Sequence, residues 1–116
     1  MSIQAYQRAA TQSENPRDTE YRTLATVTAN LLKVKDVGRN DLGALSVAIQ
    51  DNRRLWSIFA LDCAQAENQM GHATRAQIIS LAVFVDRHCS AVLREGAEID
   101  PLIDINRTIM EGLAGR

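Results

Sequence analysis

The segment from residue 74 to residue 107 constrains the fold most, because it combines helix boundary signals with a helical apolar pattern. Thr74 and Gln77 have the spacing of a capping box, in which a hydroxyl and an amide satisfy free backbone donors at the start of a helix. Apolar residues then share one stripe at helical spacing, namely Ile78, Leu81, Ala82, Val85, Cys89, Val92 and Leu93. The pattern predicts a helix that begins at Thr74.

The same segment contains a helix stop and a second helix start. Gly96 is favoured at a helix C-terminus because glycine adopts the left-handed backbone conformation readily. Asp100 can cap free N–H groups, and Pro101 suits the first helical turn because proline lacks a donor that would be unpaired there. Apolar residues follow at helical spacing, at Leu102, Ile105, Ile109 and Leu113. The C-terminal third of the chain therefore predicts two helices joined by a short turn.

Three more helices are predicted before this segment, and no strand pattern competes with them. The first is a short helix over residues 2–10, which lacks bulky side chains and needs tertiary support. The second starts at Asn15-Pro16 and ends near Lys35, and the turn over residues 36–40 follows it. Its main stripe consists of Tyr21, Leu24, Ala25, Thr28, Leu31 and Leu32, with Val27 and Val34 on the flank.

Asp41 is the predicted cap of the third helix, which continues to about Asn68. The main stripe of this helix consists of Leu42, Leu45, Ile49, Trp56, Phe59 and Cys63. The chain length of 116 residues fits one domain. We therefore expect an all-α fold, a compact bundle of about five helices that forms a single helical domain over residues 1–116.

The third and fourth predicted helices each carry a second apolar sector beside the main stripe. This second sector consists of Val47, Ile58 and Leu61 on the third helix and of Ile79 and Val83 on the fourth. One explanation is that central helices of a bundle contact neighbours on several sides. The other is a groove for a partner helix, because exposed apolar patches mark interaction surfaces. The sequence leaves both explanations open.

Composition argues against nucleic-acid and membrane binding. The chain has 13 basic and 14 acidic residues, a formal net charge of −1 and 4% aromatic residues, so it offers neither a basic stripe nor stacking platforms for RNA. Its longest apolar run, Ile78 to Val85, is shorter than the roughly 20 residues that span a bilayer. No secretory signal is readable at the N-terminus. We expect a cytoplasmic protein with no membrane segment and no direct nucleic-acid binding.

The sequence shows no pattern typical of catalysis or metal binding. His88 and Cys89 are adjacent on a predicted helix, so their side chains diverge by about 100° and do not chelate one ion comfortably. The acidic residues around Asp100 are explained by a favourable interaction with the helix dipole. Cys63 and Cys89 are expected to be buried, reduced thiols. We expect no enzyme activity, no cofactor and no metal.

Several motifs resemble one family of bacterial proteins. They are AYQ…ENPRDTEYR at residues 5–22, Leu55-Trp56 in the third helix, and RAQIISLAVFVDRH followed by IDPLIDINRTIMEGL at residues 75–113. Their order and spacing resemble the FlaF family of flagellar proteins from flagellated alphaproteobacteria, over nearly the whole chain. The resemblance implies a small all-helical protein that controls flagellin production, secretion and filament assembly alongside FlbT, a post-transcriptional regulator of flagellin. It implies no enzyme activity and no cofactor.

The resemblance leaves two mechanisms open. In the first, which we favour, the protein is a chaperone that binds flagellin in the cytoplasm and delivers it for secretion, as helix-in-groove binding would allow. In the second, it is a regulator that acts chiefly through FlbT on flagellin translation, without holding flagellin for export. A complex with both partners would combine the two. The sequence does not fix the direct partner, the binding surface or the oligomeric state.

Candidate partner contacts are taken from the resembling motifs, at positions with weak reasons to belong purely to the core. They are Tyr6, Arg17, Glu20, Trp56, Phe84, Arg87, Asn106 and Arg107. Trp56 has the largest apolar surface in the chain and is either a partner anchor or a core residue. Phe84 lies away from both apolar sectors of its helix, so it contacts either the last helix or a partner.

The polar candidates also have two explanations each. Arg17 and Glu20 can pair across one helical turn, which would make them a local helix contact. Asn106 and Arg107 form either a polar clamp for a partner or ordinary solvated helix surface. The sequence also leaves open whether the N-terminal helix is ordered without a partner.

Overall fold

The computed structural model describes Ile3 and residues 16–65 and 71–114. These residues form four α-helices and a short 3-10 helix, which are α2 (Pro16–Val37), η1 (Gly38–Asn40), α3 (Leu42–Cys63), α4 (His72–Glu95) and α5 (Asp100–Ala114), with no strand among them. The all-α prediction is confirmed, but the described part has four α-helices rather than about five. The predicted helix over residues 2–10 lies outside the described residues, apart from Ile3.

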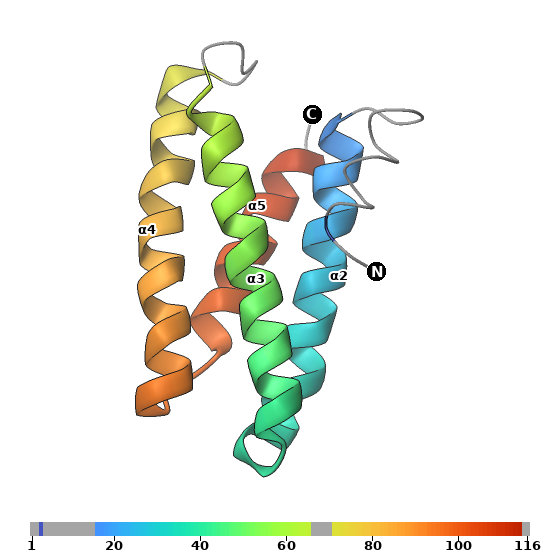
Figure 1. Ribbon diagram of the computed structural model, residues 1–116. Helices are drawn as coiled ribbons and strands as arrows, with labels where there is room; N and C mark the ends of the chain where they lie inside the picture. The colour runs from blue at the N-terminus through green and yellow to red at the C-terminus, as the bar shows by residue number, and fades with distance from the viewer. Residues whose placement is uncertain (1–2, 4–15, 66–70, 115–116) are drawn as a thin grey trace.

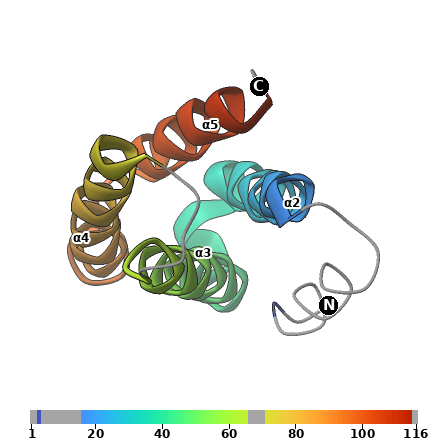
Figure 2. The same cartoon turned by 90° about the horizontal axis from the view of Figure 1, so that it is seen from above.

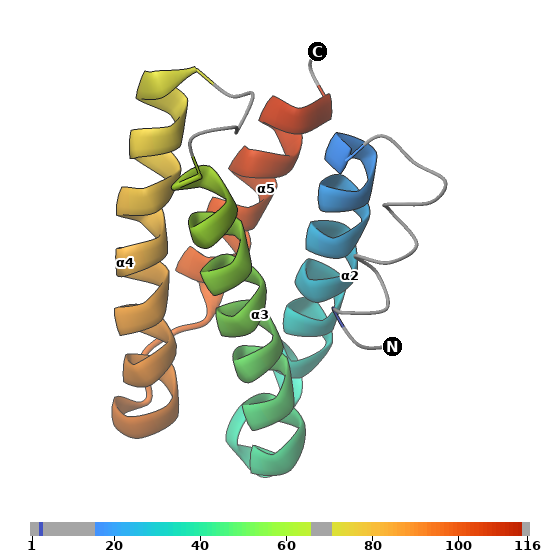
Figure 3. The same cartoon turned by 45° about the horizontal axis from the view of Figure 1, so that its top comes forward.

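The helices run alternately down and up the bundle (Figure 1). Seen along the bundle, their order around it is α4, α3, α2 and α5 (Figure 2). The pairs α3 with α4, α2 with α5, and α2 with α3 pack extensively, whereas α4 and α5 share few contacts. Figure 3 shows the space that opens between the ribbons of α4 and α5 away from their connecting turn. As a result, α4 is held mainly by α3.

Several predicted helix boundaries are confirmed. α2 starts at Pro16, and the Asp41 side chain accepts a hydrogen bond from the backbone N–H of Ala44 at 3.0 Å, as an N-cap does. Gly38 and Gly96 adopt positive φ values of 47° and 75°, the conformation that glycine tolerates at a helix end. The turn predicted over residues 36–40 contains η1.

The predicted boundaries on either side of residues 66–70 are wrong. α4 starts at His72, so Thr74 lies inside the helix, and the N-cap position is taken by Gly71 without a side-chain cap. α3 ends at Cys63 and does not continue to about Asn68. The Arg75 guanidinium donates to the carbonyl oxygens of Cys63 at 2.6 Å and Gln65 at 2.7 Å. A cationic donor from α4 thus satisfies carbonyls that the end of α3 leaves free.

The main core follows the predicted stripes of α3 and α4 closely, apart from Leu42, which is 59% exposed, but that of α2 less so. Its buried residues include Ile49, Phe59 and Cys63 from α3 and Ile78, Val85, Cys89 and Val92 from α4. On α2 the core face runs through Leu24, Val27, Leu31 and Val34, so the predicted flank is buried, while Tyr21 and Leu32 from the predicted stripe are exposed. This shift arises because α2 packs against both α3 and α5. Ile3 packs onto a second apolar cluster with Leu24, Val27 and Leu55.

Both cysteines are free and buried, as predicted. Burial raises the pKa of the Cys63 and Cys89 thiols, because removal from water disfavours the thiolate. Cys89 also lies against polar neighbours, with its sulfur 4.0 Å from Asn52 Nδ2 and 3.9 Å from the carbonyl oxygen of Ile49. The thiols therefore act as small core residues.

Hydrogen bonds between polar side chains cross the centre of the bundle. Trp56 Nε1 donates to Asn106 Oδ1 at 2.8 Å, and Asn106 Nδ2 donates to Asn52 Oδ1 at 2.8 Å. All three side chains are fully buried. A buried polar group without a partner is costly, so this network favours one register of α5 against the diagonally opposite α3.

The network predicts that substitutions at two neighbouring positions have unequal effects on the free energy of unfolding. Asn106→Ala leaves Trp56 Nε1 and Asn52 Oδ1 without partners, and we expect it to lower the free energy of unfolding by about 3 kcal/mol. Arg107→Ala, at an exposed position, should change it by no more than about 0.5 kcal/mol. Urea unfolding followed by circular dichroism measures both. Equal effects of the two substitutions would show that the network does not contribute to stability.

Candidate functional site

A groove of about 470 Å³ runs between α3 and α4 on the outside of the bundle. Its walls come from residues that share one face of each helix, with Trp56 at its base. They are Arg53, Ser57, Ala60 and Leu61 on α3 and Ile79, Ala82, Val83, Asp86 and Arg87 on α4. We call this surface the α3/α4 groove. Small side chains at Ser57, Ala60 and Ala82 leave room between the two helices.

The upper part of the α3/α4 groove is apolar and exposed. Leu61 is 66% exposed, Val83 is 50% exposed and Ile79 is also exposed. These residues belong to the second apolar sector of α3 and α4, which the described bundle does not cover. Of the two explanations open from the sequence, a groove for a partner helix fits these three positions. Val47, in the same sector, is exposed outside the groove, and Ile58 is half-buried.

α4 contains a long apolar stretch. It is long and apolar enough to cross a membrane by length and composition alone, a test that core helices of soluble proteins also pass. Only 22% of its most apolar stretch is buried. The absence of a membrane segment stays a prediction, and the observed feature is an apolar stretch of α4 that the bundle buries only in part.

Arg53 closes the lower part of the groove by joining its two walls. Its Nε lies 3.1 Å from Asp86 Oδ1, and its Nη2 donates to the Asp86 carbonyl oxygen at 2.8 Å and to Ser90 Oγ. One guanidinium on α3 therefore holds a carboxylate, a carbonyl and a hydroxyl of α4. Such a fork fixes geometry better than a single point charge would. The groove is thus preformed in the structure.

The predicted partner contacts do not gather on one surface. Arg87 lines the α3/α4 groove and is exposed. Trp56 and Asn106 are buried and hydrogen-bonded to each other, so Asn106 is neither part of a polar clamp nor solvated helix surface, and Trp56 is a core residue. Arg107 is exposed on α5.

The remaining predicted contacts lie on α2, on α4 or outside the described residues. Glu20 is half-buried on α2. Arg17 lies in the first turn of α2, but its side chain and the whole of Tyr6 are outside the described part of the chain. Phe84 is 44% exposed and stacks on His88, with ring centroids 5.5 Å apart and an interplanar angle of 14°.

Phe84 faces away from the α3/α4 groove, because it is absent from the groove lining and its stacking partner lies one turn along α4. His88 Nε2 is 2.6 Å from the carbonyl oxygen of Glu98, which ties this edge of α4 to the turn before α5. α4 therefore exposes apolar side chains on two sides.

The charged groups at the start of α5 serve the fold. Asp100 forms an ion pair with Lys35 of α2, and the carboxylate raises the pKa of that ammonium by hydrogen bonding and by charge. In the described residues, no group of three His, Cys, Asp or Glu side chains is placed to hold a metal ion. The structure thus gives Asp100 a packing role between α2 and α5.

The sequence named Leu61, Ile79 and Val83 only within a possible groove for a partner helix, and they were not among the candidate contacts. The signal that could have found them was present, because all three belong to the second apolar sector of their helices. Choosing contacts from family motifs favoured large or charged side chains instead. The groove depends on how two helices are packed side by side, which no single motif contains.

Exposure predicts different effects of removing the two phenylalanines of the chain. Phe59 is 5% exposed and belongs to the core, so Phe59→Ala should lower the free energy of unfolding by about 3 to 5 kcal/mol. Phe84→Ala should lower it by less than about 1 kcal/mol, because that side chain is already 44% exposed. Thermal unfolding by circular dichroism compares the two. A large fall in Tm for Phe84→Ala would make Phe84 a bundle contact.

Comparison with known proteins adds one match. The family model described as flagellar protein FlaF matches residues 2–113, a span that includes the described bundle apart from the last residue of α5 and includes both walls of the α3/α4 groove. No curated protein and no solved structure matches the chain. Because the family model covers nearly the whole chain, the chain belongs to the FlaF family of flagellar proteins.

Proposed function

We propose that this flagellar protein binds flagellin in the cytoplasm as a chaperone and adaptor, with FlbT as a second partner. In this role it promotes flagellin production, secretion and filament assembly. Membership of the FlaF family supports the flagellar context. The observation that carries the proposal is the exposed apolar α3/α4 groove.

The groove has the properties that helix-in-groove binding requires. An amphipathic helix places apolar residues at positions i, i+3 or i+4, and i+7 into such a groove. Burial of the exposed side chains of Leu61, Ile79 and Val83 supplies a hydrophobic driving force of about 25 cal/mol per Å². Because Arg53 already holds the walls together, little ordering free energy is lost when the partner binds.

A second partner surface is supported by the other side of α4. Phe84 is exposed there, away from the groove. Aromatic side chains often anchor protein interfaces. Flagellin in the groove and FlbT at Phe84 would allow both to bind at once, whereas binding of FlbT alone would make the protein a regulator of flagellin translation.

Two valine substitutions test the groove under matched conditions. Val83→Glu places a charge in the groove, whereas Val47→Glu places the same charge at an exposed position of α3 outside it, since Val47 is 63% exposed. We expect Val83→Glu to weaken the complex at least about tenfold, because the carboxylate would lose water on binding. We expect Val47→Glu to bind as the unchanged chain does. Size-exclusion chromatography with light scattering measures complex formation.

Flagellin and FlbT are mixed with the protein separately and then together. A flagellin complex that is lost with Val83→Glu and kept with Val47→Glu supports the chaperone. A complex with FlbT alone would replace it with the regulator. Binding to neither partner, or equal loss of binding with both variants, would contradict the proposed role of the groove.

A further inference from the structure

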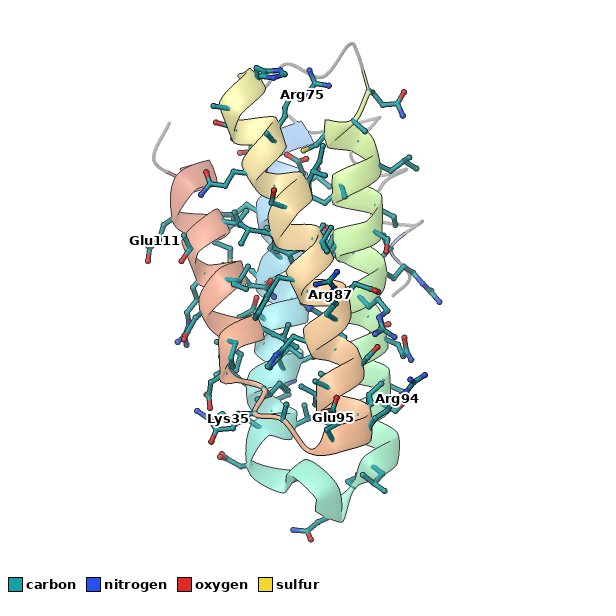
Figure 4. All side chains as sticks on the ribbon, turned by 90° about the vertical axis from the view of Figure 1, so that its left-hand side faces the viewer. Lys35, Arg75, Arg87, Arg94, Glu95 and Glu111 are labelled. Carbon is teal, nitrogen blue, oxygen red and sulfur yellow. The ribbon has the colours of Figure 1, made fainter. Side chains whose placement is uncertain are left out.

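Arginine side chains share the helix faces that carry the apolar part of the α3/α4 groove, and one of them, Arg87, lines the groove. On α4, Arg87 and Arg94 follow Val83 by 4 and 11 residues, spacings that keep them on one helix face. On α3, Arg54 precedes Leu61 by 7 residues and shares its face in the same way. Figure 4 shows Arg87 and Arg94 one below the other along the outside of the bundle.

These arginines are exposed and uncompensated. In the part of the chain that the structure describes, Arg54, Arg87 and Arg94 make no ion pair, whereas the charge of Arg53 is neutralised by Asp86. The whole chain has a formal net charge of −1, and the one carboxylate that lines the groove, Asp86, is already paired with Arg53, so the charge that the groove lining leaves unpaired is the positive charge of Arg87. A guanidinium also matches the planar fork of a carboxylate better than a lysine does.

We infer that the groove binds an amphipathic helix whose apolar face is followed by acidic residues. The apolar face packs against Leu61, Ile79 and Val83, and the acidic residues pair with Arg87 and Arg94. At 1.5 Å per residue, these arginines lie about 6 Å and about 16 Å along α4 from Val83. A helix lying along α4 therefore carries its acidic residues about 4 and about 11 residues from its apolar centre. This inference rests on the proposed use of the groove and adds the chemistry of the bound segment.

The groove suits a protein helix better than a nucleic acid. Its exposed apolar residues are aliphatic, and its one aromatic residue, Trp56, is buried. Single-stranded RNA needs exposed aromatic faces for stacking and a longer basic track for its phosphates. An apolar wall followed by separated arginines matches an acidic amphipathic helix in both hydrophobicity and charge.

Three synthetic peptides of about 20 residues test the inference with the full-length chain. Two share one apolar helix face and carry either glutamate or lysine at the positions that meet the arginines. The third has the composition of the glutamate peptide in scrambled order. We expect the glutamate peptide to bind at least about tenfold more tightly than either other peptide, because opposite charges attract and like charges repel across an interface. Fluorescence anisotropy measures the three affinities.

Two further measurements, at different salt concentrations and with charge-reversed variants, identify the side chains responsible for the preference for the glutamate peptide. The preference for glutamate should shrink between about 0.05 M and about 0.5 M salt, because exposed ion pairs are screened. The double variant Arg87→Glu/Arg94→Glu should reverse the preference. The control Lys33→Glu/Arg107→Glu makes the same change in net charge at exposed positions on α2 and α5, and it should keep the preference.

Equal affinities for the glutamate and lysine peptides, tight binding of the scrambled peptide, or displacement of the glutamate peptide by an RNA oligonucleotide would each overturn the inference. These failures differ from failure of the proposed function. If flagellin binds in a Val83-dependent way but the peptides show no charge preference, only the acidic character is wrong. If the glutamate peptide is preferred but neither flagellin nor FlbT binds, the groove chemistry stands and the proposed partners are wrong.

Discussion

The side chains of Trp56, Asn106 and Asn52 are hydrogen-bonded at the centre of the bundle, where a lost partner would leave a polar group buried and unsatisfied. Apolar packing alone tolerates small shifts between helices, whereas these bonds require α3 and α5 to keep one register. With α3 placed in this way, Arg53 and Leu61 lie beside α4, and the two helices together form the groove. The outer surface therefore depends on polar contacts in the interior.

Local features of the sequence predicted the fold well. The cap at Asp41, the stop at Gly96 and the start at Pro16 depend on residues within one helical turn, and the structure has them where the sequence placed them. The end of α3 was predicted wrongly because Arg75, a residue of the next helix, satisfies its carbonyls. The core face of α2 was displaced for the same kind of reason, since its two neighbours decide which side is buried.

The site was less predictable, because it depends on contacts between segments far apart in the sequence. Trp56 and Asn106 are separated by 50 residues, and nothing near either one shows that they bind each other in the core. The groove needs small side chains on both α3 and α4 at the same level along the bundle axis. Neither helix sequence alone shows that these side chains lie next to each other. A second apolar sector on each helix indicated this groove in the sequence, and of the candidate contacts the groove includes Arg87 on its exposed wall and Trp56 at its buried base.

The few contacts between α4 and α5 give the bundle an uneven distribution of local stability. A helix attached along one side can detach while the other three remain packed, so its opening free energy lies below that of global unfolding. We expect hydrogen exchange in α4 to be faster than in α3, and a partner that spans both helices to slow it. A partner bound in the α3/α4 groove would raise the opening free energy of α4 toward that of the other three helices, so that all four helices would unfold together.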